Sequence, residues 1–373
     1  MSLVKYFSSV SLQDVRPSAE GTGFCLILFF FFSCPFAITV ISSIHFRDFG
    51  ENPPPLPSRH KILEYLGNSS SIPSTFLLSG IPGLEHMHIW ISIPLCFMYL
   101  VSILGNCMIL FIIKTEPSLH KPMYLFLSML ALTDLGLSLC TLPTVLGIFW
   151  MGTREIGHNA CFAQLFFIHC LSFLESSVLL SMAFDRFVAI CHPLHYASIL
   201  TNTAIGRIGL ASLGRSVALI LPLPFMLKRF PYCHSSVLSH SYCLHQEVMN
   251  LGCADIKANS IYGMFVIIST VGVDLLLIFF SYALIVHTVL SIASRAERLK
   301  ALNTCVSHIC AVLLFYTPMI GLSVIHRFGK QAPHLVQVVM GFMYLLVPPL
   351  MNPIVYSVKT KQIRDQVTRA FCY

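Results

Sequence analysis

Eight long apolar runs, each nearly free of charge, limit what this 373-residue chain can fold into. Each run approaches the roughly 20 residues that an α-helix needs to cross a bilayer. Charged residues make up 10% of the chain, whereas a soluble domain carries about 25%, so there is too little charge to cover a water-facing surface. The runs are continuous rather than alternating, which excludes a transmembrane β-barrel. The sequence therefore predicts an all-α membrane protein.

Seven of the runs share a consistent pattern and predict a bundle of seven transmembrane helices. Prolines inside the runs do not argue against helices, because neighbouring helices can satisfy the freed backbone groups. We expect the spans at residues 88–113, 123–150, 161–189, 208–227, 260–286, 301–325 and 334–357. The bundle then occupies residues 68–357, and an amphipathic tail follows over 358–373.

The eighth run, residues 24–44, lies in an N-terminal extension that covers residues 1–67. It reads as a cleaved signal sequence, as an eighth span that leaves residues 1–23 inside, or as an extension with no fixed role. Its flanks are nearly neutral, so loop charge does not choose among these interpretations. We expect a signal-like or spare anchor segment outside the working bundle, with residues 45–87 forming an exposed linker.

The loops predict an orientation across the plasma membrane. With the N-terminus of the first span outside, the inner loops and tail carry eleven lysines and arginines and the outer loops carry six, which is the usual positive-inside sign. The glycosylation sequon at Asn68 then faces outward, and the C-terminus is cytoplasmic. Cys161, Cys233, Cys243 and Cys253 also fall on the outer side, where disulfides persist. Four cysteines allow three connectivities, and spacing alone does not choose among them.

Ionisable residues inside spans cost roughly 2.5–3.5 kcal/mol each to insert, so each one needs a reason. Asp134 and Glu175 fall near mid-depth of adjacent spans. Both cannot stay ionised cheaply, so either one takes a proton or a cation such as sodium sits between them. The alternative is a protonated pair bonded to Ser138 or Asn106. Arg215 is interpreted as reaching toward the interface or a partner helix, and we assign it no function.

Two polar motifs lie at the inner ends of the third and seventh spans. Asp185 and Arg186 are adjacent at the end of the third, and Asn352, Pro353 and Tyr356 occur in the seventh. A proline there frees a carbonyl and marks a kink, and Asn352 can bond the exposed backbone. Taken with Gly105, Asn106 and Asp134, this set resembles the rhodopsin-like family of G-protein-coupled receptors.

Further motifs resemble the olfactory receptors within that family. They are Glu175 in the third span and the segments at 120–124, 184–187, 191–196, 281–282 and 300–308. The long second outer loop, with its run over 238–246, resembles the class I, or fish-like, branch. The resemblance covers residues 68–373. Phe187 and Asn303 depart from the usual Tyr and Ser, and the N-terminal extension has no counterpart in the family pattern.

The resemblance implies disulfides from Cys161 to Cys243 and from Cys233 to Cys253, which would pin the outer loop as a lid over the bundle. It also implies a ligand site between the outer halves of the third to sixth helices, beneath that lid. The candidate ligand-binding residues are His169, Ser172, Gln246, Ser323 and Arg327. Since an Arg fork matches a carboxylate, we expect a small carboxylic acid or similarly polar odorant.

The implied function is an odorant receptor that activates a stimulatory G protein and raises cyclic AMP. Ligand binding would release Arg186 from Asp185, and Tyr282 with Tyr356 would hold the open state. The alternatives are a receptor of the same class for a non-odorant metabolite outside the nose and, more remotely, a secondary transporter, which would predict an internal repeat that the sequence lacks.

Other function classes are excluded. The sequence shows no zinc-spaced ligand set, nucleophile elbow or phosphate loop of an enzyme, so we expect no catalytic residues and no cofactor apart from a bound sodium ion. We assign no metal ligands, and a metal at His169 or at His240 and His245 stays an open alternative. The seventh span contains no lysine for the Schiff base of a light sensor. The net charge of +7 is not clustered with aromatic residues, so nucleic acid is not an expected partner, whereas membrane lipids are.

Overall fold

The structure, a computed structural model, describes residues 75–81, 84–232, 236–253, 255–328 and 333–371. The N-terminal extension, with its apolar segment 24–44, lies outside the described residues, as do the sequon at Asn68 and Cys233. The side chain of Arg327 also lies outside them.

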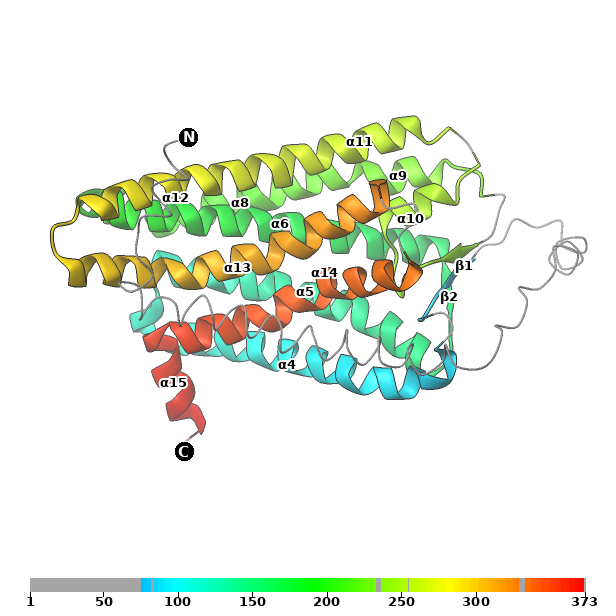
Figure 1. Cartoon of the computed structure of the whole chain (residues 1–373), viewed down its shortest axis with the longest axis horizontal. Helices are drawn as coiled ribbons and strands as arrows, with labels where there is room; N and C mark the ends of the chain where they lie inside the picture. Colours follow the sequence, from blue (N-terminus) through cyan, green and yellow to red (C-terminus); the bar gives the residue numbers. More distant parts are fainter. Residues whose placement is uncertain (1–74, 82–83, 233–235, 254, 329–332, 372–373) are drawn as a thin grey trace, which may run out of the picture.

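Among the described residues, seven helical segments are long and apolar enough to cross a membrane, which confirms the predicted bundle (Figure 1). Two spans are composite, because α8 continues as α9 and because α11 passes through a π-helical turn, η5, into α12. The elements of the spans are α4 (His88–Thr115), α5 (Pro122–Trp150), α6 (His158–Cys191), α8 (Asn202–Ile220), α9 (Pro222–Lys228), α11 (Lys257–Ile267), η5 (Ile268–Gly272), α12 (Val273–Ser291), α13 (Arg295–Phe328) and α14 (His334–Lys359).

Several helices extend beyond the ranges predicted from hydropathy. The sixth span begins at Arg295 rather than at 301, and the fourth begins at Asn202 rather than at 208. The added turns contain charged and polar residues, which lie outside the apolar run. Hydropathy therefore locates the lipid-crossing part of each helix and misses its polar ends.

Large apolar side chains point outward from the bundle. Trp90 and Phe97 on α4 and Phe279 on α12 are each more than half exposed. Contiguous exposed apolar surface of this extent is rare in soluble monomers and marks contact with other apolar surroundings. The outward faces of these helices are therefore suited to lipid, while α6 and α14 are the most deeply buried of the seven spans.

The contact between α4 and α14 depends on a glycine and an asparagine. Pro353 has no N–H to bond the Pro349 carbonyl one turn earlier, and Asn106 Nδ2 donates to that carbonyl at 2.9 Å. The expectation that Asn352 bonds the exposed backbone is therefore wrong, because Asn106 from the first span fills that role. A Cβ on Gly105 would lie 2.9 Å from Pro353 Cβ, so glycine permits the close approach.

A small sheet lies at one end of the bundle, beside α10 (His245–Asn250) (Figure 1). Strand β1 (Thr75–Leu78) pairs antiparallel with β2 (Glu155–Gly157) and parallel with β3 (Val237–Leu238). The expectation that residues 45–87 form an exposed linker is wrong for β1, where Phe76 and Leu78 are buried. Alternation in the strand turns these two side chains inward, a signal too short to read from four residues.

At the other end of the bundle, helix α15 (Lys361–Phe371) follows α14 and turns away from it (Figure 1). It is amphipathic, as predicted for the tail. Ile363 is fully buried, and Tyr124 OH donates to the Gln362 side-chain oxygen. The short connecting helices are η2 (Glu85–Met87), η3 (Pro117–Leu119), η4 (Pro193–His195) and α7 (Tyr196–Ile199).

Replacing Gly105 tests the close contact between α4 and α14. Gly105→Ala drives a methyl group into the Pro353 ring, and overpacking of this kind costs roughly 1–3 kcal/mol. We expect a lower melting temperature for the detergent-purified protein. Gly214→Ala is the matched control, because this helical glycine has open space around its Cβ position and alanine favours helix by about 1 kcal/mol. Equal effects of the two substitutions would contradict the packing argument.

Candidate functional site

A cavity of about 60 Å³ lies between α6, α11, α13 and α14 near the end of the bundle that carries the small sheet, and α10 covers it. Three of the predicted ligand-binding residues line it from three different elements: His169 on α6, Gln246 on α10 and Ser323 on α13. The rest of the lining is mostly apolar and includes Phe173 and Met319. An apolar pocket with a few convergent polar groups is the usual form of a small-molecule site.

The other two predicted residues are placed differently. Ser172 does not line the cavity; it is buried and its Oγ accepts a 2.7 Å hydrogen bond from Tyr344 OH, and Tyr344 does line the cavity. Arg327 belongs to α13, one turn beyond Ser323, and its side chain is outside the described part. Tyr344 was missed from the sequence, although a phenol in an otherwise apolar span is a signal for a hydrogen-bonded position.

The loop between α9 and α11 is held over the cavity as a lid, which we define as residues 236–253. A disulfide joins Cys161 at the start of α6 to Cys243, with a Cα–Cα distance of 5.5 Å, the pairing that the family resemblance implies. The Cys243 N–H donates to Gln164 Oε1 at 3.0 Å, and Tyr242 OH donates to the Gly341 carbonyl on α14 at 2.8 Å. Cys253 is also disulfide-bonded, and Cys233 lies outside the described residues.

The lid also contains one buried acid, Glu247 on α10. Burial alone would raise its pKa, but the neighbouring His240, the backbone N–H of Ser239 and the charge of His326 together lower the pKa of Glu247 to about 2. The carboxylate is therefore ionised at neutral pH. Since Glu247 follows Gln246 directly, a fixed negative charge lies one residue from the cavity wall.

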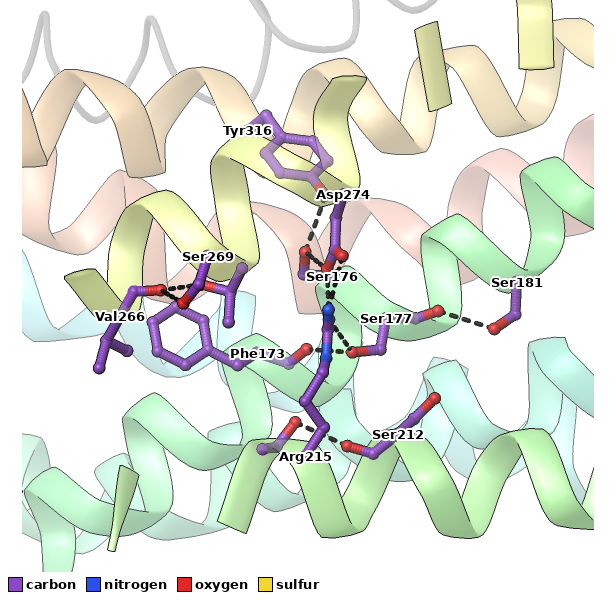
Figure 2. Close-up of polar contacts among 12 residues, drawn as sticks. Phe173, Ser176, Ser177, Ser181, Ser212, Arg215, Val266, Ser269, Asp274 and Tyr316 are labelled. Carbon is purple, nitrogen blue, oxygen red and sulfur yellow. Dashed lines mark hydrogen bonds and ion pairs between the residues drawn. The ribbon is translucent and has the colours of Figure 1, made fainter. Parts of the chain in front are cut away.

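A partly buried ion pair links four helices below the cavity (Figure 2). Arg215 on α8 donates to both carboxylate oxygens of Asp274 on α12, at 2.8 and 2.5 Å, and to Ser177 Oγ on α6 at 2.6 Å. Ser176 Oγ donates to Asp274 at 2.8 Å and lies 2.8 Å from Tyr316 OH on α13. Because Ser176 uses its proton on the carboxylate, Tyr316 is the donor to Ser176.

This network was missed from the sequence, which assigned Arg215 no function. The signal was present, because Arg215 and Asp274 are ionisable residues of opposite charge in neighbouring spans, where such residues usually pair. Spacing could not show that Arg215 reaches past the third helix to the fifth. The paired groups make a bidentate fork, the strongest geometry for such a contact.

Two carboxylates and an amide meet at mid-depth in the bundle. Asn352 Nδ2 lies 3.0 Å from Asp134 Oδ2 and 3.2 Å from Glu175 Oε1. Within the described residues, Glu175 Oε2 has no hydrogen-bond partner. The structure therefore brings together the two acids that the sequence paired, and it adds Asn352 as the donor that both accept from. Such a cluster accommodates a shared proton or a small cation.

The end of the bundle opposite the lid holds the remaining predicted residues in closed contacts. Arg186 Nη2 lies 3.1 Å from Asp185 Oδ2, and Tyr196 OH donates to Asp185 Oδ1 at 2.7 Å. Tyr282 OH lies 2.7 Å from His308 Nδ1 on α13. Since His308 Nε2 lies 2.9 Å from the Leu179 carbonyl, which only accepts, Nε2 carries the proton and Tyr282 donates to Nδ1.

The seventh helix contributes to the same end. Tyr356 is fully buried, and its OH lies 3.9 Å from the Met182 sulfur on α6. Pro353 packs against Gly105, as described above. The predicted residues of this end are thus held in contacts inside the bundle, with Arg186 largely covered.

Comparison with known proteins identifies the family that this chain resembles. A family model described as olfactory receptor matches residues 95–373. Olfactory receptor 51G2 of Homo sapiens is 89% identical over 309 residues, covering 83% of this chain and 98% of that protein. Olfactory receptor 51G1 of Homo sapiens is 66% identical over 304 residues, covering 82% of this chain and 95% of that protein.

The Arg215–Asp274 pair is open to a double-mutant test. Asp274→Leu leaves the guanidinium without its carboxylate, and loss of one partner of a buried pair costs roughly 3–5 kcal/mol. The Arg215 side chain is 34% exposed, so we expect the low end of that range. Arg215→Met with Asp274→Leu should recover most of the loss in melting temperature.

Arg207→Met is the control for removing an arginine from α8, because Arg207 is exposed. It should leave the melting temperature nearly unchanged. Additive losses in the double variant would show that Arg215 and Asp274 do not act as a pair.

Proposed function

The chain belongs to the olfactory receptor family and is an odorant receptor rather than an enzyme, and we propose that it binds a small polar odorant in the cavity beneath the lid. The observation that carries this proposal is the convergence of His169, Gln246 and Ser323 on one cavity. These side chains come from α6, α10 and α13, so a single ligand would touch both the lid and the helix that must move.

A compact ligand with one polar head fits this site. The cavity volume of about 60 Å³ is far below the roughly 300–1,000 Å³ of pockets for drug-sized ligands. Hydroxyl, amide and imidazole groups offer donors to a carboxylate or hydroxyl, and the apolar lining suits a short hydrocarbon chain. We propose a short carboxylic acid, with Arg327 adding its guanidinium and Ser172 supporting the site through Tyr344.

The protein is a multi-pass protein of the plasma membrane, and we propose that the lid faces outward. The disulfide between Cys161 and Cys243 supports this, because disulfides persist on the extracellular side. Glycosylation at Asn68 and a second bridge from Cys233 to Cys253 belong to the same face. Residues 68–357 would then form the receptor domain after a 1–67 extension, and residues 358–373 the cytoplasmic tail.

Activation would open the contacts at the inner end. A ligand shifts the equilibrium only through tighter binding to the active arrangement. Pulling the outer end of α13 toward the ligand would swing its inner end outward about Pro318, break the bond between Tyr282 and His308, and free Arg186 from Asp185. The freed Arg186 would meet a G protein, which we propose is of the stimulatory type that raises cyclic AMP.

The acid cluster would tune this equilibrium. We propose that Asp134 and Glu175, bridged by Asn352, hold either one proton or one sodium ion in the described arrangement. Helix α14 carries Asn352 together with Pro353 and Tyr356. A shift of α14 would therefore change the acid cluster and the inner end together.

A cyclic-AMP assay of the surface-expressed receptor tests the proposed ligand class. Short carboxylic acids should activate it in preference to esters and alcohols of the same length. Ser323→Ala removes a hydrogen bond to a charged head, worth about 1.5–3 kcal/mol, so acid potency should fall by roughly tenfold or more. Ser291→Ala is the matched control, because Ser291 is exposed on α12 and bonds its own helix.

Arg327→Ala tests the proposed contact between Arg327 and the ligand carboxylate separately from the rest of the proposal. A variant that reaches the surface and keeps full acid response would remove Arg327 from the site. Response to esters with none to acids would overturn the carboxylate assignment while leaving the cavity as the binding site.

A further inference from the structure

Three potential metal ligands cluster between the lid and the outer end of α13, outside the odorant cavity. His240 and Glu247 belong to the lid and His326 to α13, and one nitrogen or oxygen from each lies within 4.8 Å of the others. Glu247 Oε1 is 3.6 Å from His240 Nδ1 and 3.6 Å from His326 Nδ1. All three side chains are largely or fully buried.

Hydrogen bonds on the far side of each lid residue turn the free atoms inward. His240 Nε2 lies 3.2 Å from the Gln337 carbonyl on α14, so Nε2 carries the proton and the Nδ1 lone pair faces Glu247. Glu247 Oε2 accepts from the Ser239 N–H at 2.8 Å, leaving Oε1 toward the two imidazoles. Groups that bind metals are typically oriented in this way by a second hydrogen bond.

Ordinary hydrogen bonds do not account for the centre of the cluster. Both 3.6 Å separations exceed hydrogen-bonding distance, and His240 Nδ1 and His326 Nε2 have no hydrogen-bond partner among the residues that the structure describes. A nitrogen lone pair facing a carboxylate oxygen is repulsive, so either a proton on the imidazole or a metal cation must lie between them. Two imidazoles and one carboxylate are the ligand types and number of a zinc site with an open position.

We propose that His240, Glu247 and His326 bind a divalent transition-metal ion of the zinc type. Zinc bonds of about 2.0–2.2 Å in tetrahedral geometry separate the ligand atoms by roughly 3.4 Å. The observed 3.6 Å spacings are close to that value, so small side-chain rotations complete the site. Imidazole with carboxylate also suits copper and nickel, and a water molecule would take the fourth position.

The ion would hold together two elements that line the odorant cavity, the lid and α13. Glu247 adjoins Gln246, and His326 lies about one turn beyond Ser323; both neighbours line that cavity. The same ion would join the lid to α13, while His240 is already bonded to α14. Because the ion binds this arrangement, it stabilises it by mass action.

Metal binding to the purified full-length receptor tests the site independently of any odorant. After removal of metal with a chelator, Co²⁺ should bind with one-to-one stoichiometry and give the visible absorption of a tetrahedral site, and Zn²⁺ should displace it and raise the melting temperature. Glu247→Gln removes a direct ligand, so it should weaken Zn²⁺ binding by more than the roughly 10–100-fold loss of affinity that follows removal of a residue that only orients a ligand. His86→Ala is the control, because His86 is an exposed histidine near the same end.

Two further variants keep the test decisive if Glu247→Gln folds poorly. Glu247→His supplies a third imidazole and should retain Zn²⁺ binding, whereas His326→Ala should lose it. Absence of saturable Co²⁺ or Zn²⁺ binding to the native receptor would overturn the proposal, as would equal binding by the native receptor and His326→Ala. In that case the cluster is an imidazolium–carboxylate group. The proposal that an odorant binds in the cavity would still stand.

Discussion

A polar group buried between helices in lipid must find its partner within the protein, because no water is present to replace it. This requirement organises the bundle. Asn106 bonds the carbonyl that Pro353 frees on α14, and Arg215 reaches across α6 to Asp274 on α12. Each partner lies on a different helix, so every satisfied group also fixes the position of one helix relative to another.

Helix α6 connects these contacts along its length. From the lid inward it carries the cystine at Cys161, the cavity residue His169, the network residue Ser176, and the Asp185–Arg186 pair. Helix α13 meets it through Tyr316 in the middle and His308 further in. A ligand that favours one position of α13 relative to α6 therefore changes the contacts at both ends of the bundle. Packed interfaces of this kind have discrete arrangements rather than continuous ones.

Much of the fold and the site could be predicted, because an ionisable residue inside an apolar span needs a partner and is therefore informative by itself. The spans follow from hydropathy, and the pairing of Asp134 with Glu175 follows from the cost of two acids in adjacent spans. The partner of Arg215 could not be predicted, because a long side chain can reach any of several helices. Strand β1 and the His240–Glu247–His326 cluster were also missed, since both depend on how the lid folds back, which spacing does not encode.

The central claim is that the described closed contacts are one state of a two-state bundle whose inner end opens to a G protein. Spin labels introduced by Thr115→Cys and Ala296→Cys would lie at exposed inner-end positions of α4 and α13, with exposed Cys107 replaced. Pulsed electron paramagnetic resonance then gives the distance between them. The account predicts a shift to longer distances when a nucleotide-free stimulatory G protein binds. An unchanged distance distribution in a complex shown to have formed would contradict it.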